Sequence, residues 1–152
     1  MTTFPALDQL TALPMCHRAT IPPEYQDAMG HMNVRWYMAL FDEAAWRLFD
    51  SFGMDADYYQ QGQGGGFALK HFIHYLAEVH VGETVALRAR LLGRSAKRVH
   101  FMLFMVNETR GVLAATLEGL GSHADMRLRR TAPYPPQIAA AIDTLLAEHT
   151  AL

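Results

Sequence analysis

The chain contains 152 residues, 51% of them hydrophobic, and carries a formal net charge of −2 at pH 7. A chain of this size and composition is expected to form one domain, residues 1–152, with an apolar core large enough to argue against disorder. The near-neutral charge argues against a reader of nucleic acid or of anionic membrane surfaces, so any site for an anion must be local.

The cysteine content and the hydropathy pattern bear on the compartment. Cys16 is the single cysteine, so an internal disulfide cannot form. The first residues lack a basic segment followed by an apolar run of signal-peptide length. Charged or polar residues interrupt every apolar run before it reaches the roughly 20 residues that a membrane-spanning helix needs. We therefore expect a cytoplasmic protein that makes no contact with membranes.

The first half of the chain is organised around one long predicted helix. Residues 1–16 are expected to form a short arm or a single helical segment, and residues 17–21 a strand that ends at Pro22-Pro23. Apolar side chains then recur at the spacing of one buried helix stripe: Val34, Tyr37, Phe41, Ala45, Leu48 and Phe52. Asn33 is a suitable N-cap and Gly53 a suitable stop, so the pattern predicts a helix of roughly 27 Å.

The second half of the chain changes to the hydrophobic period of a sheet. Residues 54–66, with Gly64-Gly65-Gly66, are predicted to be a mobile connection, since they lack the sequence context of a phosphate-binding loop. Strands are then predicted over residues 67–81, 85–91, 99–105 and 112–120, the last continuing into 123–128. A helix is predicted over about residues 136–149, after two prolines. The expected fold class is α+β, with an antiparallel sheet wrapped around one long central helix.

Asp27 lies a few residues before the long predicted helix, in the segment Asp27-Ala28-Met29-Gly30-His31-Met32-Asn33. A helix start presents unpaired backbone N–H groups and the positive end of the helix dipole, so an acid placed here adjoins a site suited to negative charge. An isolated aspartate at such a position is more often a turn residue or a cap. Position alone leaves both roles open.

Three segments of the chain resemble a known family. These are the Asp27–Asn33 segment before the helix, residues 75–83 (YLAEVHVGE) and residues 93–98 (GRSAKR). Together with the order of elements over about residues 17–130, they resemble the hotdog-fold acyl-CoA thioesterases of the 4-hydroxybenzoyl-CoA thioesterase type. The segments GHMNVRWYMALFDEA, KRVHF, LAAT and APYPP are similar to the betainyl-CoA thioesterase branch of that family.

This resemblance implies hydrolysis of a small acyl-CoA, betainyl-CoA being one candidate, without metal or cofactor, because coenzyme A is part of the substrate. Asp27 would attack the thioester carbonyl or activate the attacking water, and the backbone N–H of Val34 would polarise the carbonyl oxygen. His31 would be a general acid or an orienting group, and Asn33 a cap or a substrate contact. Further substrate contacts are implied at Gly30, Trp36 and Tyr37, and phosphate contacts at Arg94, Lys97 and Arg98.

Several of these residues also fit ordinary structural roles without a function in binding or catalysis. The three cations are by default a solvated hairpin tip. Aromatic residues usually pack in the core, although Trp36, Tyr37, Tyr58 and Tyr59 are candidates for a cage around a quaternary ammonium group. At the level of function, a hotdog enoyl-CoA hydratase or dehydratase and a non-catalytic acyl-CoA-binding protein remain open. A long exposed sheet edge must be paired or covered, so a homodimer or homotetramer is expected, with the site near the subunit boundary.

The chain has eight histidines, which raises the question of a metal site. His71 and His74 are three residues apart on a predicted strand and would face opposite sides of it. His74 and His80 would share a face but lie roughly 20 Å apart along the strand, too far for one ion. We predict that no metal is bound.

Overall fold

The computed structural model describes residues 2–152. The elements follow in the order α1 (Leu7–Thr11), β1 (Met15–Thr20), the 3-10 turn η1 (Pro23–Tyr25), α2 (Val34–Asp50), α3 (Ala56–Gln60), β2 (Gly64–Tyr75), β3 (Thr84–Arg94), β4 (Arg98–Asn107), β5 (Val112–Asp125), β6 (Arg130–Thr131) and α4 (Pro136–Thr150).

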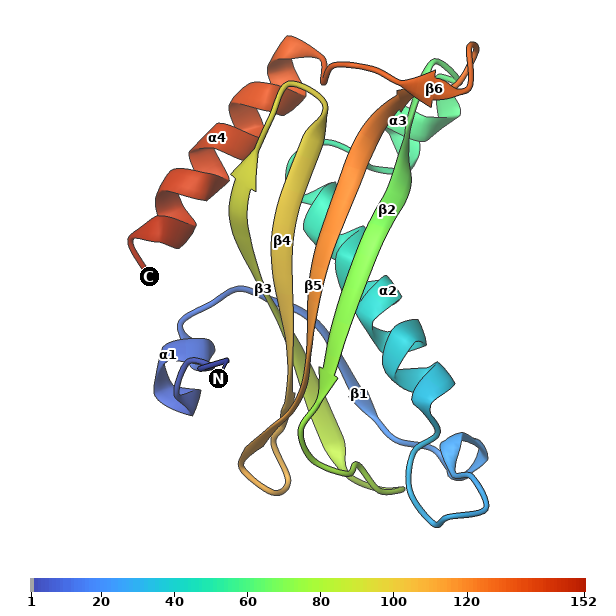
Figure 1. The fold of residues 1–152 in the computed structure, drawn as a ribbon, viewed down its shortest axis with the longest axis vertical. Coiled ribbons are helices and arrows are strands. Elements are labelled where there is room, and N and C mark those ends of the chain that lie inside the picture. Colours follow the sequence, from blue (N-terminus) through green and yellow to red (C-terminus); the bar gives the residue numbers. More distant parts are fainter. Residues whose placement is uncertain (1) are drawn as a thin grey trace.

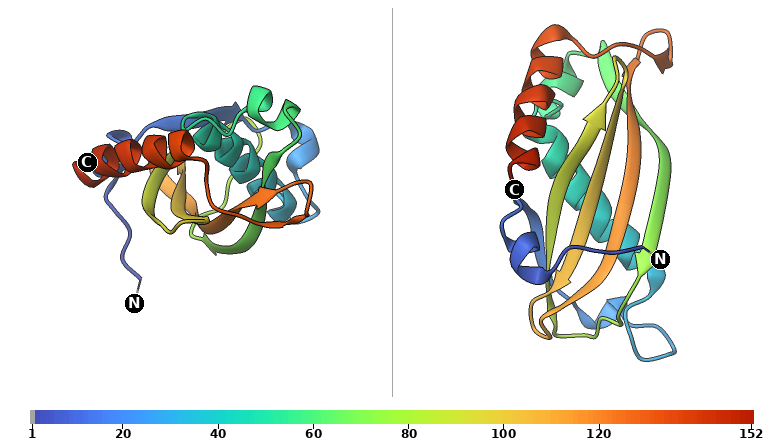
Figure 2. Two further views of the ribbon diagram at one scale, coloured as in Figure 1. Left: turned by 90° about the horizontal axis from the view of Figure 1, so that it is seen from above. Right: turned by 60° about the vertical axis from the view of Figure 1, so that its left-hand side comes forward.

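One antiparallel sheet forms the body of the molecule. Its strands lie in the order β1-β3-β4-β5-β2, with the short β6 paired to the end of β5. The sheet curls around α2, which crosses its concave face (Figures 1 and 2). The predicted α+β architecture, a sheet wrapped around one long helix, is confirmed.

The core fills the space between α2 and the inner face of the sheet. The buried stripe of α2 consists of Tyr37, Leu40, Phe41, Ala44 and Leu48. It packs against alternate residues of the central strands, such as Leu87, Leu103 and Leu117, which are at most 1% exposed. The apolar residues that recur with a period of 3.6 in the helix and of 2 in the strands, as predicted from the sequence, therefore pack together in one hydrophobic cluster.

The glycine run is part of β2 and not the mobile connection expected from the sequence. α3 precedes it, and Gly64 already pairs with Asp125 of β5. A Cβ atom at Gly64 would lie 2.0 Å from the Tyr58 hydroxyl, and one at Gly65 would lie 2.8 Å from the Met126 sulfur. The glycines are thus needed for close packing against neighbouring side chains, a role that is compatible with a strand.

β2 also ends earlier than predicted, at Tyr75 rather than Val81. The amides of Leu76 and Ala77 both donate to the carbonyl of Ala114, and the chain then bends away from the sheet. His80 therefore does not share a strand face with His74, so the spacing argument made for that pair does not apply.

Both ends of the chain cover parts of the sheet. Leu10 and Leu13 pack against Phe104 and Val106 on the outer face. α4 lies along the end of β3, where the Nδ1 atom of His149 accepts a 2.9 Å hydrogen bond from the Leu91 amide. Within residues 2–152, β2 has a hydrogen-bonded strand on one side only. Among the same residues, no helix is both long and apolar enough to cross a bilayer.

Candidate functional site

The segment before α2 folds into a tight turn that presents the Asp27 carboxylate. The Gly30 amide donates to the Asp27 carbonyl at 3.1 Å, and the Asp27 amide donates to the His31 carbonyl at 3.1 Å. Gly30 closes the turn with a φ of 83°, which L side chains rarely adopt. No atom lies within 4 Å of a Cβ built there, so the constraint on Gly30 is conformational and not one of space.

Two hydrogen bonds hold the Asp27 side chain in this turn. The Met29 amide donates to Oδ1 at 2.9 Å, and the Asn33 side-chain amide donates to Oδ2 at 3.3 Å. The Met29 bond is the main cause that lowers the pKa of Asp27 below its ordinary value, with the Asn33 bond and the nearby His31 adding to it. Asp27 is therefore a half-buried carboxylate that is ionised near neutral pH.

Asn33 joins this carboxylate to the start of α2. Its Oδ1 atom accepts the Arg35 amide at 3.1 Å, which makes Asn33 the N-cap of the helix, as predicted. Its side-chain amide simultaneously bonds Asp27. The Val34 amide belongs to the first turn of the helix, where N–H groups have no intrahelical acceptor, and the Val34 side chain is exposed. The carboxylate and this amide thus lie at one helix end.

The bend that follows β2 supports the turn from behind. The Met32 amide donates to the Val79 carbonyl at 2.7 Å, and the Tyr37 hydroxyl donates to the Ala77 carbonyl at 3.3 Å. Glu83 anchors the bend, because it accepts the His80 amide at 2.6 Å and pairs with Arg110. The family-like segment over residues 75–83 therefore positions the turn, a relation that no local sequence pattern shows.

The aromatic residues at the helix start have packing partners. Trp36 stacks on Tyr25 with ring centroids 4.0 Å apart. Tyr37 is 4% exposed, belongs to the core and contacts Tyr75 edge to face, so its side chain is not presented to a substrate as implied from the sequence. Tyr58 and Tyr59 lie in α3, at the opposite end of α2 (Figure 1). The structure does not bring these four aromatic residues together as one cage.

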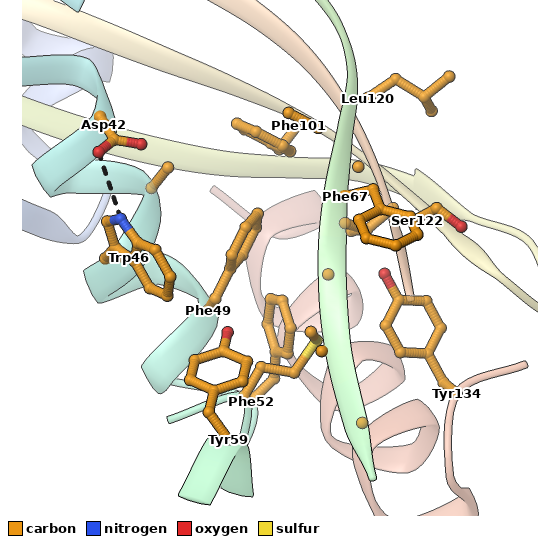
Figure 3. Close-up of a pocket in the computed structure, with 18 of the residues that line it drawn as sticks. Asp42, Trp46, Phe49, Phe52, Tyr59, Phe67, Phe101, Leu120, Ser122 and Tyr134 are labelled. Atoms are coloured by element: carbon orange, nitrogen blue, oxygen red, sulfur yellow. Dashed lines mark hydrogen bonds between the residues drawn. The ribbon is translucent and has the colours of Figure 1, made fainter. Parts of the chain in front are cut away.

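A large cavity lies farther along α2, between the second half of the helix and the first half of β2. Its volume is about 460 Å³ (Figure 3). The walls are mostly aromatic or glycine, with one carboxylate, and include Asp42, Trp46, Phe49, Tyr59, Gly64, Gly65, Gly66, Phe67, Phe101, Ser122 and Tyr134. Sequence reasoning missed this cavity. The sequence does carry one signal that could have indicated the cavity. This is a second aromatic face of the helix, at Trp46 and Phe49, opposite a strand of small residues.

The structure removes Arg94 from the predicted cationic cluster of Arg94, Lys97 and Arg98. Arg94 makes a two-pronged ion pair with Asp143 of α4, with N–O distances of 2.6 and 2.8 Å. This pairing raises the pKa of Arg94 and withdraws it from phosphate binding. Lys97 and Arg98 remain exposed at the β3–β4 turn. Residues 2–152 contain no group of three or more His, Cys, Asp or Glu side chains placed to hold a metal ion.

The geometry at the start of α2 suits attack on a carbonyl group. An ionised carboxylate can act as a nucleophile or direct a water molecule, and a helix-start amide can donate to an oxygen that becomes negative. One such fixed donor is typically worth about 3 to 4 kcal/mol of transition-state stabilisation. His31 adjoins the same turn, and Gly30 shapes it.

Comparison with known proteins gives a consistent result. The model of the Thioesterase-like superfamily matches residues 21–142. An L-carnitine dehydrogenase/betainyl-CoA thioesterase of Agrobacterium fabrum is 33% identical over 132 residues, which cover 87% of this chain and 27% of that protein. The chain thus spans about a quarter of the length of that relative.

Two further similarities span most of both partners. A betainyl-CoA thioesterase of Pseudomonas aeruginosa is 27% identical over 136 residues, covering 90% of this chain and 86% of that one. A Staphylococcus aureus protein whose structure was solved in complex with CoA superposes with a TM-score of 0.83 at 23% identity, covering 89% of this chain and 85% of the other. The latter likeness bears on the fold alone.

Proposed function

The chain belongs to the thioesterase-like superfamily, and from this we propose that it is an acyl-CoA thioesterase. The observation that carries the proposal is the ionised Asp27 carboxylate held beside the free start of α2. Family membership supplies the reaction class, and the turn supplies the groups that the reaction needs.

In the proposed reaction the Val34 amide donates to the thioester oxygen. Asp27 either attacks the carbonyl carbon, forming an anhydride that water then hydrolyses, or takes a proton from the attacking water. In both routes the C–S bond breaks, and the sulfur leaves as CoA and takes up a proton. The products are a free acid and CoA thiol. His31, next to Asp27, and Gly30, which closes the turn, are the remaining parts of this site.

The relatives suggest a small acyl group. Both named relatives are betainyl-CoA thioesterases in whole or in part. Because the Pseudomonas relative bears only that name and matches along most of its length, betainyl-CoA is the first substrate to test. Lys97 and Arg98, exposed at the β3–β4 turn, are the cations that we assign to the phosphates of CoA.

We further propose that the enzyme is a homodimer joined through β2. The middle of this edge strand is exposed on both faces, and Leu69, Phe72 and Tyr75 are 43 to 55% exposed. Such an apolar edge is normally paired or covered. The strand at the opposite edge, β1, offers a shorter pairing surface, since it has 6 residues against 12 in β2.

Two-fold pairing of β2 has a consequence for the site. A strand that pairs with its own copy about a two-fold axis runs antiparallel to it. The Tyr75 end of β2 adjoins the start of α2 through the Tyr37–Tyr75 contact, whereas the Gly64 end lines the cavity. The dimer would therefore set the cavity of one subunit beside the catalytic turn of the other.

The test is thiol release from a panel of acetyl-, betainyl- and arylacyl-CoA thioesters by the wild type and Asp27→Asn. We expect loss of at least about a hundredfold in kcat, because the variant lacks the ionised oxygen. Asp8→Asn is the matched control. Asp8 also accepts a backbone amide, that of Gln9 at 2.9 Å, but lies in α1, which packs on the outer face of the sheet.

The outcomes separate the rival functions. Equal rates for the wild type and Asp27→Asn would remove Asp27 from the mechanism. CoA binding without thiol release would favour an acyl-CoA-binding protein. Loss of enoyl absorbance from a 2-enoyl-CoA without thiol release would favour a hydratase. Any of these results contradicts the proposal.

A further inference from the structure

Glu83 carries a buried charge that has no part in the reaction steps proposed above. The residue is 8% exposed and lies at the end of the bend that follows β2. Its Oε1 atom accepts the His80 amide at 2.6 Å and the Asn107 side-chain amide at 3.3 Å, and its Oε2 atom pairs with the Arg110 guanidinium. A buried carboxylate is costly unless it is both paired and hydrogen-bonded, and Glu83 meets both conditions.

Glu83 stays ionised despite its burial. Desolvation alone would raise the pKa of Glu83, but its hydrogen bonds from His80, Arg110 and Asn107 outweigh this effect and lower it. Arg110 is the cation that faces the carboxylate. On the side of α2, burial raises the pKa of Tyr37, and Glu83 contributes to the rise, so this neighbour stays neutral. The ion pair between Glu83 and Arg110 is therefore intact at neutral pH.

The Glu83 side chain ties the bend to the turn between β4 and β5. His80 belongs to the bend, where its carbonyl accepts the Glu83 amide at 3.1 Å and Gly82 has a φ of 85°. Asn107 and Arg110 belong to the β4–β5 turn, where the Asn107 Oδ1 atom accepts the Arg110 amide at 3.2 Å. The carboxylate thus closes a four-residue turn of the bend and fastens it to a second turn.

The loop between Ile21 and Met32, which carries Asp27, is attached to the same bend at both ends. Before the loop, the Ile21 amide donates to the Glu83 carbonyl at 2.9 Å. After the loop, the Met32 amide donates to the Val79 carbonyl at 2.7 Å. Ile21, Met32 and Val79 are at most 1% exposed. A movement of the bend would therefore carry both ends of the loop with it.

The loop is also braced internally. Gln26 and Met32 form an antiparallel bridge across it, and the Asn33 amide donates to the Tyr25 carbonyl at 2.9 Å. The Asp27 carboxylate is therefore held in a small closed unit, and the position of this unit follows from the position of its two ends.

The start of α2 rests on the bend as well, because the Tyr37 hydroxyl donates to a carbonyl of the bend at 3.3 Å. The two groups proposed for the reaction, the Asp27 carboxylate and the Val34 amide, thus share one support. We propose that Glu83 is a positioning residue of this site, which together with Arg110 fixes the bend and, through it, the placement of both groups. This inference rests on the proposed thioesterase function and extends it to a residue that acts through the backbone.

The first experiment measures kcat and KM by thiol release, with the CoA thioester that the wild type hydrolyses fastest. Glu83→Gln keeps the shape of the side chain and an acceptor for the His80 amide, but it loses the ion pair with Arg110. We expect kcat to fall at least about tenfold, because a shift of about 1 Å between reacting groups can cost more than this. KM should change by less than about twofold, since Lys97 and Arg98, which we assign to CoA, lie at another turn.

Glu108→Gln is the matched control. Glu108 lies in the same β4–β5 turn and pairs with Arg18 at 2.6 Å, but this ion pair joins the turn to β1 and not to the bend. Its loss should leave kcat and KM unchanged. Arg110 provides a test of rescue. Arg110→Lys keeps a cation for Glu83 and should retain most of the activity, whereas Arg110→Met should lose at least as much kcat as Glu83→Gln.

The second experiment does not depend on hydrolysis. Hydrogen exchange followed by NMR at pH 7 compares the amides of Ile21 and Met32, which bond to the bend, with the Leu103 amide in the middle of β4. Glu83→Gln should speed exchange of the first two at least about tenfold more than that of Leu103, because a local opening exposes only the amides that it frees. Glu108→Gln should show no such difference.

The outcomes separate a positioning role from general stability. An unchanged kcat in Glu83→Gln, whether or not KM changes, would overturn the inference. A loss of kcat with equal acceleration of all three amides would also overturn it, since that pattern means that the whole fold is destabilised. Absence of thiol release by the wild type, together with selective acceleration at Ile21 and Met32, would instead overturn the thioesterase proposal and leave the coupling of Glu83 to the Asp27 loop standing.

Discussion

Backbone geometry lowers the pKa of Asp27 more than neighbouring charge does. The largest cause that lowers its pKa is the hydrogen bond from the Met29 amide, which exists only while the turn is closed. The positive φ of Gly30 makes that closure possible. A carboxylate held in this way is available over the whole physiological pH range.

This electrostatic setting predicts the acid limb of the pH profile. A lowered pKa means that Asp27 stays charged as the pH falls, and it loses its charge only below its ordinary pKa of 3.8. We therefore expect kcat/KM to stay level on the acid side down to about pH 4, since this parameter reports the free enzyme. Initial rates on short incubation measure it.

Circular dichroism at each pH is the control for that profile, because an unfolded protein would also lose activity. An apparent pKa of 5 or above in a fully folded protein would contradict the assignment of Asp27 as the group that must be ionised. Replacement of the turn glycine, Gly30→Ala, should move the acid limb to higher pH. The variant strains the turn that supplies the Met29 hydrogen bond, and this bond is what lowers the pKa of Asp27.

At the scale of elements, α4 is attached to the sheet by a neutral histidine. His149 is 3% exposed, and its Nδ1 atom accepts the Leu91 amide, so the ring must carry its proton on Nε2. Burial lowers the pKa of His149, Arg90 adds to this effect and Glu148 opposes it. The position in the last turn of α4 would favour a charged ring, but desolvation outweighs the helix dipole.

The lowered pKa predicts that acid loosens α4. Between the ordinary pKa of 6.5 and the lower folded value, the unfolded chain binds a proton that the folded chain excludes, so stability falls as the pH falls through this window. Thermal unfolding at pH 7.5, 6.5 and 5.5 should show a declining Tm. His149→Gln, which cannot titrate, should show a smaller decline.

A matched variant separates this effect from general acid destabilisation. Thr150 lies next to His149 in the last turn of α4, and its hydroxyl donates to the Leu146 carbonyl at 2.7 Å. Thr150→Val removes a hydrogen bond of the same turn without removing a titratable group, so it should keep the pH dependence of the wild type. An equal slope in the wild type and His149→Gln would show that the α4 contact does not respond to acid.

At the scale of the whole molecule, the Asp27 turn and the cavity lie at different parts of the long α2 axis. The turn adjoins Val34, whereas Phe49 in the cavity wall lies about 22 Å away along the helix. A dimer through β2 would bring the turn of one subunit to the cavity of the other. Function would then require two chains for a geometric reason.

Subunit mixing tests this arrangement. Asp27→Asn lacks the carboxylate that we propose to be catalytic, and Ala45→Phe places a ring in the cavity that Ala45 lines. Each variant alone should be inactive on a substrate that fills the cavity. After subunit exchange, about half of the dimers are mixed and each has one intact site of two, so we expect about a quarter of wild-type activity. Thiol release measures it.

In the control mixture, Ala140→Phe takes the place of Ala45→Phe. It adds the same ring on the exposed side of α4, away from the cavity, and should be active on its own. Native mass spectrometry of the mixtures, with one variant isotope-labelled, verifies that the subunits exchange. No recovery of activity in a fully exchanged mixture of the first two variants would show that each site uses the turn and cavity of a single chain.

Much of this molecule could be predicted from local patterns. The buried stripe from Tyr37 to Leu48, the Asn33 cap and the alternating strands follow from short-range periodicity, and the structure confirms them. The same periodicity predicts Val34 in this stripe, but it is 57% exposed because it stands at the free start of the helix. The glycine run misled the prediction, because glycine favours loops locally while close contacts with Tyr58 and Met126 place it in a strand. Propensity is a weak guide where tertiary packing decides.

The sequence by itself indicated the fold class and the turn before α2, since both depend on patterns among residues that are near neighbours in the chain. The catalytic role proposed for Asp27 came from the family resemblance. Only the tertiary structure decided three matters. It paired Arg94 with Asp143, buried Tyr37 beneath the bend after β2, and opened a cavity in which Tyr134 faces aromatic residues of α2. Each joins segments far apart in sequence, and which distant side chains meet is set by how helix and sheet pack, a relation without a local signature.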